Sequence, residues 1–127
     1  MAEAIARTRR AESGVSFESA GLYALEGAPA SEYATAAVAE VGADASAHTA
    51  RPITREMAES ADHIYVMTSA HREALLHMGA DLENKVDLLD SAGKDIPDPF
   101  GEDLDVYRRV RDRIERAIEV RATEWIA

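Results

Sequence analysis

The sequence contains no cysteine among its 127 residues. This absence excludes a disulfide scaffold, a thiolate metal site and a thiol nucleophile within the chain. Basic residues are also scarce: 14 lysines and arginines stand against 24 acidic residues, which leaves a net charge of −10. Nucleic acid is therefore a poor partner, because phosphate contacts need a basic face.

Long apolar runs are absent too, and none reaches the roughly 20 residues that a membrane-spanning helix needs. The N-terminal stretch MAEAIARTRR favours a helix with an acid early and bases late, not a signal peptide. Hydrophobic residues nevertheless make up 46% of the chain. We therefore expect one soluble domain over residues 1–127, long enough to bury a core and best suited to an intracellular protein.

Helix and strand patterns alternate along the whole chain, which is typical of an α/β domain with a largely parallel sheet. The sequence predicts helices at about residues 2–12, 31–41, 54–61, 69–78 and 103–125. It predicts strands at residues 15–22, 64–67 and 85–91. Five helices with only three strands make a lopsided domain, which suggests that a strand is missing.

The first two predicted strands differ in their apolar patterns. In residues 15–22, apolar and polar residues alternate at first, which predicts a half-buried edge strand. In residues 64–67 the apolar run is unbroken, which predicts a strand covered on both faces.

Asp98 stands between two prolines in the stretch DIPDPFG, just ahead of the last predicted helix. Pro97 and Pro99 restrict the backbone around it, which suits a catalytic carboxylate that must hold its position. An Asx turn, or a cap on the following helix, explains an aspartate here equally well. The residues alone leave both interpretations open.

The histidines give no indication of a metal centre. His63, His71 and His77 have neither metal-ligand spacing nor convergent carboxylates. We therefore expect solvent-facing or capping histidines and no metal site.

Five stretches along the chain resemble the low-molecular-weight protein-tyrosine phosphatases of the bacterial type. In order, they are MAEAIAR, SAGL with EGAPAS, SAHTARPIT, ADHIYVMTSAH and DIPDPFG. They resemble the family's helix after the catalytic loop, its second strand and exit, its His-x-Ala-Arg segment, its third strand and its general-acid loop. The DPFG sequence also resembles the protein-arginine phosphatase branch.

The resemblance implies a three-layer α/β sandwich with a parallel sheet of strand order 2-1-3-4. It also implies that the family's first strand and its Cys-x5-Arg-Ser/Thr-Pro phosphate loop lie upstream of Met1. That strand is a central one, so we expect an N-terminally truncated domain with unpaired strand edges. Such a domain should fold poorly or be repaired by pairing, for example with a second copy of the chain or with the N-terminal peptide.

The same resemblance assigns roles to three residues. Asp98 corresponds to the general acid, Phe100 would line the pocket mouth, and His48 would support the phosphate loop. The reaction would hydrolyse phosphotyrosine or phosphoarginine on proteins through a phosphocysteine intermediate, with no metal or organic cofactor. Loss of a nucleophile can cost on the order of 10⁶-fold in turnover, so we expect the 127-residue chain to be inactive.

Two other functions are alternatives to a truncated cytoplasmic phosphatase. A non-catalytic binding or dimerisation module could use the exposed strand edge of the same fold. Thioredoxin-coupled arsenate reduction shares the fold but needs several cysteines, which this chain lacks. The choice between phosphotyrosine and phosphoarginine stays open, because the residue that best separates the branches lies in the missing loop.

Overall fold

The computed structural model describes residues 1–11, 13–22 and 25–125. Its elements are α1 (Ala2–Arg9), α2 (Glu32–Ala39), α3 (Arg55–Ser60), β1 (Ile64–Val66), α4 (Ser69–Met78), the 3-10 helix η1 (Ala80–Lys85), β2 (Val86–Leu88) and α5 (Leu104–Ala122). All five predicted helices are confirmed, whereas η1 was not foreseen. The first helix ends at Arg9, before its predicted end at residue 12, which itself lies outside the described residues. None of the described helices is both long and apolar enough to cross a membrane.

Side-chain caps explain where most of the helices begin. The oxygens of Ser31, Thr54, Thr68 and Asp103 each accept a hydrogen bond from the backbone N–H three residues further on. Each cap satisfies one of the N–H groups that a helix start leaves without an intrahelical partner. The helices that frame the site described below therefore start at positions fixed by sequence.

The strands β1 and β2 form a parallel two-stranded sheet. In its register Ile64 lies opposite Val86, and Val66 lies opposite Leu88. The crossover between them runs through α4 and η1, and α4 packs against both strands. The predicted α/β class with a parallel sheet is therefore confirmed.

The predicted strand at residues 15–22 is wrong in its pairing. Burial alternates as expected, because Val15, Phe17 and Ser19 are partly buried between exposed neighbours. Within the described part of this segment, however, no strand forms, and the only pairing is an isolated bridge at Gly21. The alternation of side chains shows which face is buried, but a ladder also needs a neighbouring strand.

Arginine side chains bind two carbonyl groups of this extended segment. Arg7 donates to the carbonyl of Phe17 at 2.8 Å, and Arg51 donates to that of Ser19 at 3.1 Å. These bonds satisfy acceptors that a strand ladder would otherwise use. The expected three-stranded sheet is therefore a sheet of two strands beside an extended segment.

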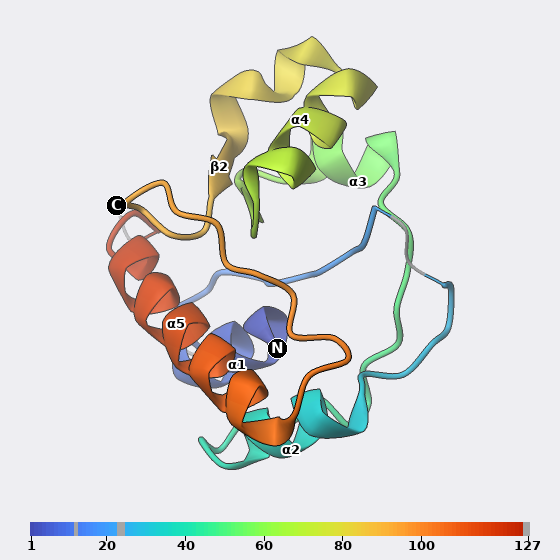
Figure 1. The fold of residues 1–127 in the computed structure, drawn as a ribbon. Helices are drawn as coiled ribbons and strands as arrows, with labels where there is room; N and C mark the ends of the chain where they lie inside the picture. The colour runs from blue at the N-terminus through green and yellow to red at the C-terminus, as the bar shows by residue number, and fades with distance from the viewer. Residues whose placement is uncertain (12, 23–24, 126–127) are drawn as a thin grey trace.

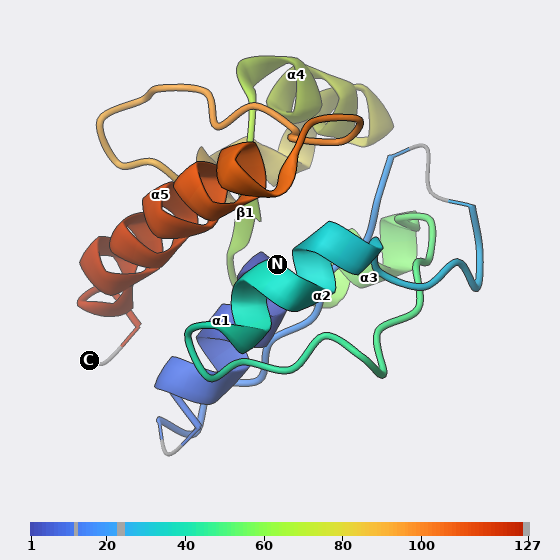
Figure 2. The ribbon, with the colours of Figure 1, turned by 60° about the horizontal axis from the view of Figure 1, so that its bottom comes forward.

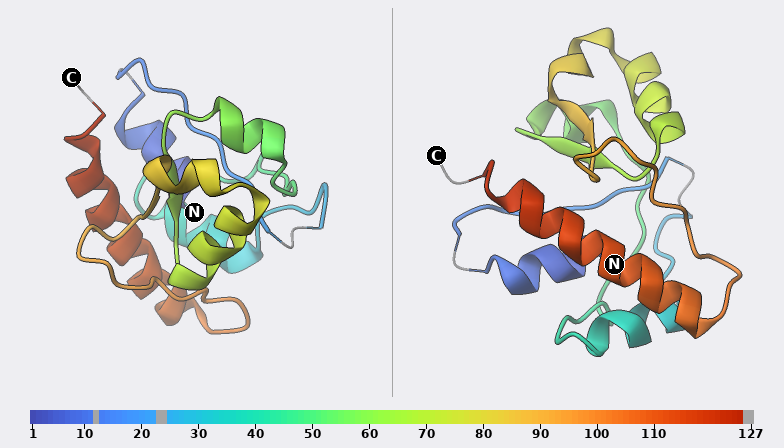
Figure 3. Two further views of the ribbon diagram at one scale, coloured as in Figure 1. Left: turned by 90° about the horizontal axis from the view of Figure 1, so that it is seen from above. Right: turned by 60° about the vertical axis from the view of Figure 1, so that its left-hand side comes forward.

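Two apolar clusters lie on the two faces of β1. Val66 belongs to the smaller cluster and Ile64 packs against it, whereas Tyr65 and Met67 pack against the larger one. Figures 1 and 3 show the same division, with α3 and α4 at one end of the molecule and α1, α2 and α5 at the other. The prediction of a strand covered on both faces is confirmed.

The longest helix, α5, holds the larger cluster together. Its buried stripe contains Tyr107, Val110, Ile114 and Ile118. The helix packs against both α1 and α2, and Figure 2 shows all three close together. Residues on α5 are therefore placed directly relative to the starts of α1 and α2.

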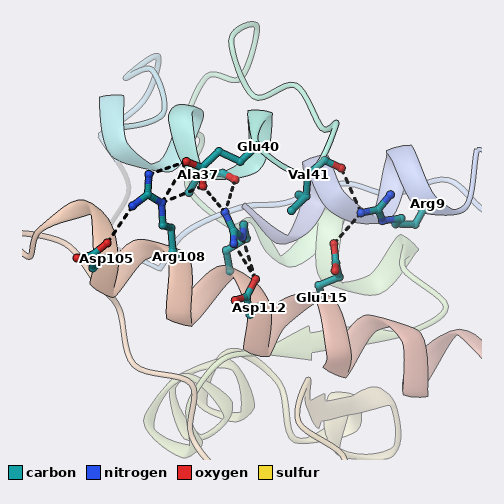
Figure 4. A network of polar contacts seen from close by, with 9 residues as sticks. Arg9, Ala37, Glu40, Val41, Asp105, Arg108, Asp112 and Glu115 are labelled. Carbon is teal, nitrogen blue, oxygen red and sulfur yellow. Dashed lines mark hydrogen bonds and ion pairs between the residues drawn. The ribbon is translucent and has the colours of Figure 1, made fainter.

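An ion-pair network fastens α2 to α5 (Figure 4). The Glu40 carboxylate accepts hydrogen bonds from Arg108 at 2.7 Å and from Arg111 at 2.6 Å. The same arginines also pair with Asp105 and Asp112, respectively. The hydrogen bonds from Arg108 and Arg111 lower the pKa of Glu40 to about 2, and those from Glu40 and Asp105 raise the pKa of Arg108.

We predict that Glu40→Gln lowers the urea midpoint of unfolding at neutral pH. The pKa of Glu40 is depressed in the folded state, so its carboxylate stabilises the fold fully above its ordinary pKa of 4.5. That contribution is lost as the pH falls through about 2. The midpoints of the variant and the parent chain should therefore differ at neutral pH and converge near pH 2.

The matched control is Glu115→Gln, which removes the carboxylate that Arg9 binds at 2.8 Å (Figure 4). It breaks one ion pair instead of two, so its effect at neutral pH should be smaller. Equal midpoints for Glu40→Gln and the parent chain at neutral pH would show that the network does not stabilise the fold.

Candidate active site

Asp98 lies in the loop between β2 and α5. Its Oδ1 accepts a hydrogen bond from the Phe100 N–H at 3.0 Å, which forms an Asx turn. Pro99 between them is buried, whereas Asp98 is exposed. Within the described residues, the carboxylate makes no other hydrogen bond or ion pair. One of its oxygens therefore orients the side chain, and the other is left to contact a ligand.

Asp98 does not cap the last helix, so that alternative is wrong. Asp103 caps α5, because its Oδ1 accepts a hydrogen bond from the Val106 N–H at 3.1 Å. Between the two aspartates, Gly101 has a φ of +86°, a backbone conformation that other residues adopt only with strain. This glycine turns the chain from the Asp98 loop toward α5.

A pocket of about 410 Å³ opens beside Asp98. Four separate parts of the chain line it: Met1 at the start of α1; Pro29, Ser31 and Ala34 around the start of α2; Asp98, Pro99 and Phe100 of the loop; and Tyr107 of α5. The structure therefore brings the two predicted residues Asp98 and Phe100 into the wall of one pocket.

The start of α1 also meets this pocket through Met1. The helix begins there without a side-chain cap, so the N–H groups of Ala2, Glu3 and Ala4 have no intrahelical acceptor. An uncapped helix start presents N–H donors and the positive end of the helix dipole to an anion.

Ser31, Tyr33 and Tyr107 hold the α2 side of the pocket against α5. The Ser31 hydroxyl donates to the Tyr107 hydroxyl at 3.4 Å and accepts the Ala34 N–H at 3.2 Å. The ring of Tyr33 packs edge-on against the ring of Tyr107, with centroids 5.8 Å apart. Because Tyr107 is also buried, this wall is fixed by packing as well as by hydrogen bonds.

His48 is not among the residues that line the pocket. It lies half-buried in the loop before α3, and its backbone N–H donates to the Ala45 carbonyl at 3.1 Å. Its ring forms no hydrogen bond with any described residue. The supporting role predicted for His48 therefore stays a prediction.

The pocket walls from Met1, Ser31 and Tyr107 were not foreseen as site residues. From sequence, Ser31 is the start of the predicted helix over residues 31–41, and Tyr107 lies within the predicted helix over residues 103–125. Nothing in local sequence indicates that these positions meet, because they come from opposite ends of the chain. The local sequence around Ser31 and around Tyr107 indicates a helix, but it does not indicate that either residue lines a pocket.

The pocket combines two features that suit phosphate chemistry. An oriented carboxylate can donate or accept a proton, and the N–H groups of an uncapped helix start can bind an anion. The 127 residues contain no cysteine, so they provide no thiolate nucleophile.

A family model described as low molecular weight phosphotyrosine protein phosphatase matches residues 1–124. A protein-arginine-phosphatase of Geobacillus stearothermophilus is 34% identical over 110 residues, which cover 84% of this chain and 74% of that protein. The low molecular weight protein-tyrosine-phosphatase Etp of Escherichia coli K12 is 32% identical over 114 residues, covering 88% of this chain and 74% of that protein.

Solved structures of phosphatases are also similar to this chain. The YwlE arginine phosphatase from Geobacillus stearothermophilus superposes with a TM-score of 0.90 at 32% identity, covering 97% of this chain and 81% of that one. Wzb of Vibrio vulnificus, in complex with benzylphosphonate, superposes with a TM-score of 0.91 at 26% identity, covering 97% and 87%. These similarities confirm the predicted fold class.

Proposed function

The chain belongs to the low molecular weight phosphotyrosine protein phosphatase family, and we propose that Asp98 is the general acid of its phosphatase site. In the proposed reaction a cysteine thiolate attacks phosphorus, and Asp98 protonates the leaving atom. Asp98 then takes a proton from the water that hydrolyses the phosphocysteine. The observation that carries this proposal is that Asp98 and the uncapped start of α1 meet at one pocket.

The local geometry of Asp98 supports this assignment. A general acid must hold a proton on one oxygen while the carboxyl group stays oriented. The bond from the Phe100 N–H to Oδ1 supplies the orientation, and the other oxygen has no partner among the described residues. The Asx turn is therefore compatible with catalysis.

We propose that Phe100 lines the mouth of the pocket, where the side chain of a phosphorylated residue would pack. Phe100 is 79% exposed although it is a large apolar residue. Wzb of Vibrio vulnificus, which binds benzylphosphonate, shows that a relative accepts an aromatic ring next to a phosphorus group. The substrates proposed here are phosphotyrosyl or phosphoarginyl proteins, in keeping with the two activities named among the relatives.

The 127 residues include no cysteine, so the nucleophile of the proposed reaction would come from a further segment. We propose that a strand followed by a Cys-x5-Arg loop completes the site, on the same or on another polypeptide. The strand would lie between β1 and residues 15–19, and His48 would support the loop. The alternating burial of residues 15–19 without a ladder is consistent with this arrangement. Without the segment we expect no hydrolysis. For a protein that contains it, the family resemblance favours a cytoplasmic enzyme.

One observation favours a second candidate function. β1 pairs only with β2 in the described sheet, so its other edge has no ladder partner there. Unpaired edges recruit other chains. A non-catalytic binding or dimerisation module would use this edge to pair with a second copy of the chain or with another protein.

Turnover assays on two proteins separate these candidates. The first is the 127-residue chain, and the second is an extended chain in which a family strand and Cys-x5-Arg-Ser/Thr-Pro loop precede Met1. We expect no hydrolysis of phosphotyrosyl or phosphoarginyl peptides by the first protein. The extended chain should hydrolyse at least one of them, and serine in place of its cysteine should abolish this. A folded but inactive extended chain would favour the binding module.

A further inference from the structure

A second pocket, of about 310 Å³, adjoins the pocket beside Asp98. The two pockets share Ser31, Phe100 and Tyr107. The remaining lining residues of the second pocket are Glu32, Tyr33, Gly101 and Glu102. A peptide whose modified residue lies beside Asp98 would therefore have this second pocket next to it.

The second pocket contains two carboxylates without a counterion. Glu32 lies in the first turn of α2 and Glu102 in the loop before α5, and both are exposed. Neither forms an ion pair with any described residue. Arg108, the nearby cation of the α2–α5 network, is already paired with Glu40 and Asp105. The pocket is therefore locally negative.

Two aromatic rings are exposed in the same pocket. Tyr33 is 45% exposed and Phe100 is 79% exposed. The face of an aromatic ring attracts a guanidinium or ammonium group, and arginine also stacks on it. Exposed rings beside unpaired carboxylates thus combine two kinds of attraction for one cation. An anionic or purely apolar ligand would gain only from part of this surface.

We propose that this second pocket binds the side chain of an arginine or lysine that lies two residues from the phosphorylated residue in a protein substrate. In an extended peptide, side chains two residues apart point to the same face and are about 6.6 Å apart along the chain, so they can occupy adjoining pockets. The role in substrate selection rests on the proposed phosphatase function. The binding of the cation itself requires no turnover.

The proposal can be tested by NMR titration of the 127-residue chain with N-acetylarginine amide. N-acetylcitrulline amide is the matched probe, because it has nearly the same shape without the charge. The arginine probe should shift the amide signals of Tyr33 and Gly101 and bind roughly tenfold more tightly than the citrulline probe. The tenfold difference in affinity is what one surface charge pair and one cation–π contact together are expected to contribute.

The double variant Glu32→Gln/Glu102→Gln should reduce binding of the arginine probe to the level of the citrulline probe. Glu102→Gln alone should reduce it about threefold; this position lies outside the helices, so helix stability is not affected. The control Glu73→Gln/Glu83→Gln removes two exposed carboxylates from α4 and η1. It should leave binding of the arginine probe unchanged.

Equal binding of the two probes, or an unchanged affinity in the Glu32→Gln/Glu102→Gln variant, would overturn the cation site. The outcome is independent of the phosphatase assays, because neither probe carries a phosphoryl group. If the titration behaves as expected and the extended chain is inactive, the cation site stands and the proposed enzymatic function fails.

Discussion

Asp98→Asn is expected to lower the turnover of the phosphotyrosyl or phosphoarginyl peptide that the extended chain hydrolyses by roughly 10²–10⁴-fold, because general acid–base catalysis contributes that much. The substitution leaves the loop geometry intact. An asparagine side-chain oxygen can accept the Phe100 N–H bond that Asp98 Oδ1 now accepts at 3.0 Å. The variant therefore loses the transferable proton and little else.

Asp95→Asn is the matched control in the same loop. Asp95 Oδ1 accepts the Ser69 N–H at 2.9 Å, a bond that asparagine can also make. Its turnover should stay within about twofold of the parent, since it removes one surface charge only. Similar turnover in the Asp98→Asn and Asp95→Asn variants would contradict the assignment of Asp98 as the acid.

Ile118→Ala is expected to lower the free energy of unfolding of the 127-residue chain by about 2–5 kcal/mol. Ile118 is 2% exposed and belongs to the larger apolar cluster, where its removal leaves a cavity. Small domains are stable by only about 5–15 kcal/mol, so this is a large share of the total. Urea unfolding followed by circular dichroism measures the change.

Val120→Ala provides the control on the same helix, because Val120 is 52% exposed. Its unfolding free energy should stay within about 0.5 kcal/mol of the parent, as is usual for surface positions. Comparable losses in the two variants would mean that the larger cluster is not the core that holds α5.

The elements that could be predicted from sequence are those with local signals at both ends. α4 begins and ends as predicted at Ser69 and Met78, because Thr68 caps its start and Gly79 follows its end. The apolar run of β1 correctly indicated cover on both faces. Residues 15–22 show where such signals stop: their alternation predicted burial but not hydrogen-bond partners, since pairing depends on a strand elsewhere in the chain.

The residues of the candidate site also fall into two groups, those that the sequence indicates and those that it does not. Asp98 and Phe100 could be singled out because the flanking prolines and the family resemblance mark their loop. Ser31 and Tyr107 could not, because each has a sufficient local explanation as a helix cap or a buried aromatic. Their convergence beside Asp98 is a consequence of α2 packing on α5, in part through Glu40. Such long-range contacts leave no periodic signal in sequence.

The most direct test of Asp98 as an acid–base group uses the extended chain carrying Asp98→Asn, with p-nitrophenyl phosphate as the substrate. The measurement is the time course of p-nitrophenol release. Nitrophenolate is a good leaving group, so nucleophilic attack needs little help from an acid. Hydrolysis of the phosphocysteine still needs a base to take the proton from water. We predict a burst that approaches one p-nitrophenol per enzyme, followed by slow turnover. Steady release at the parental rate without a burst would contradict a catalytic role for Asp98.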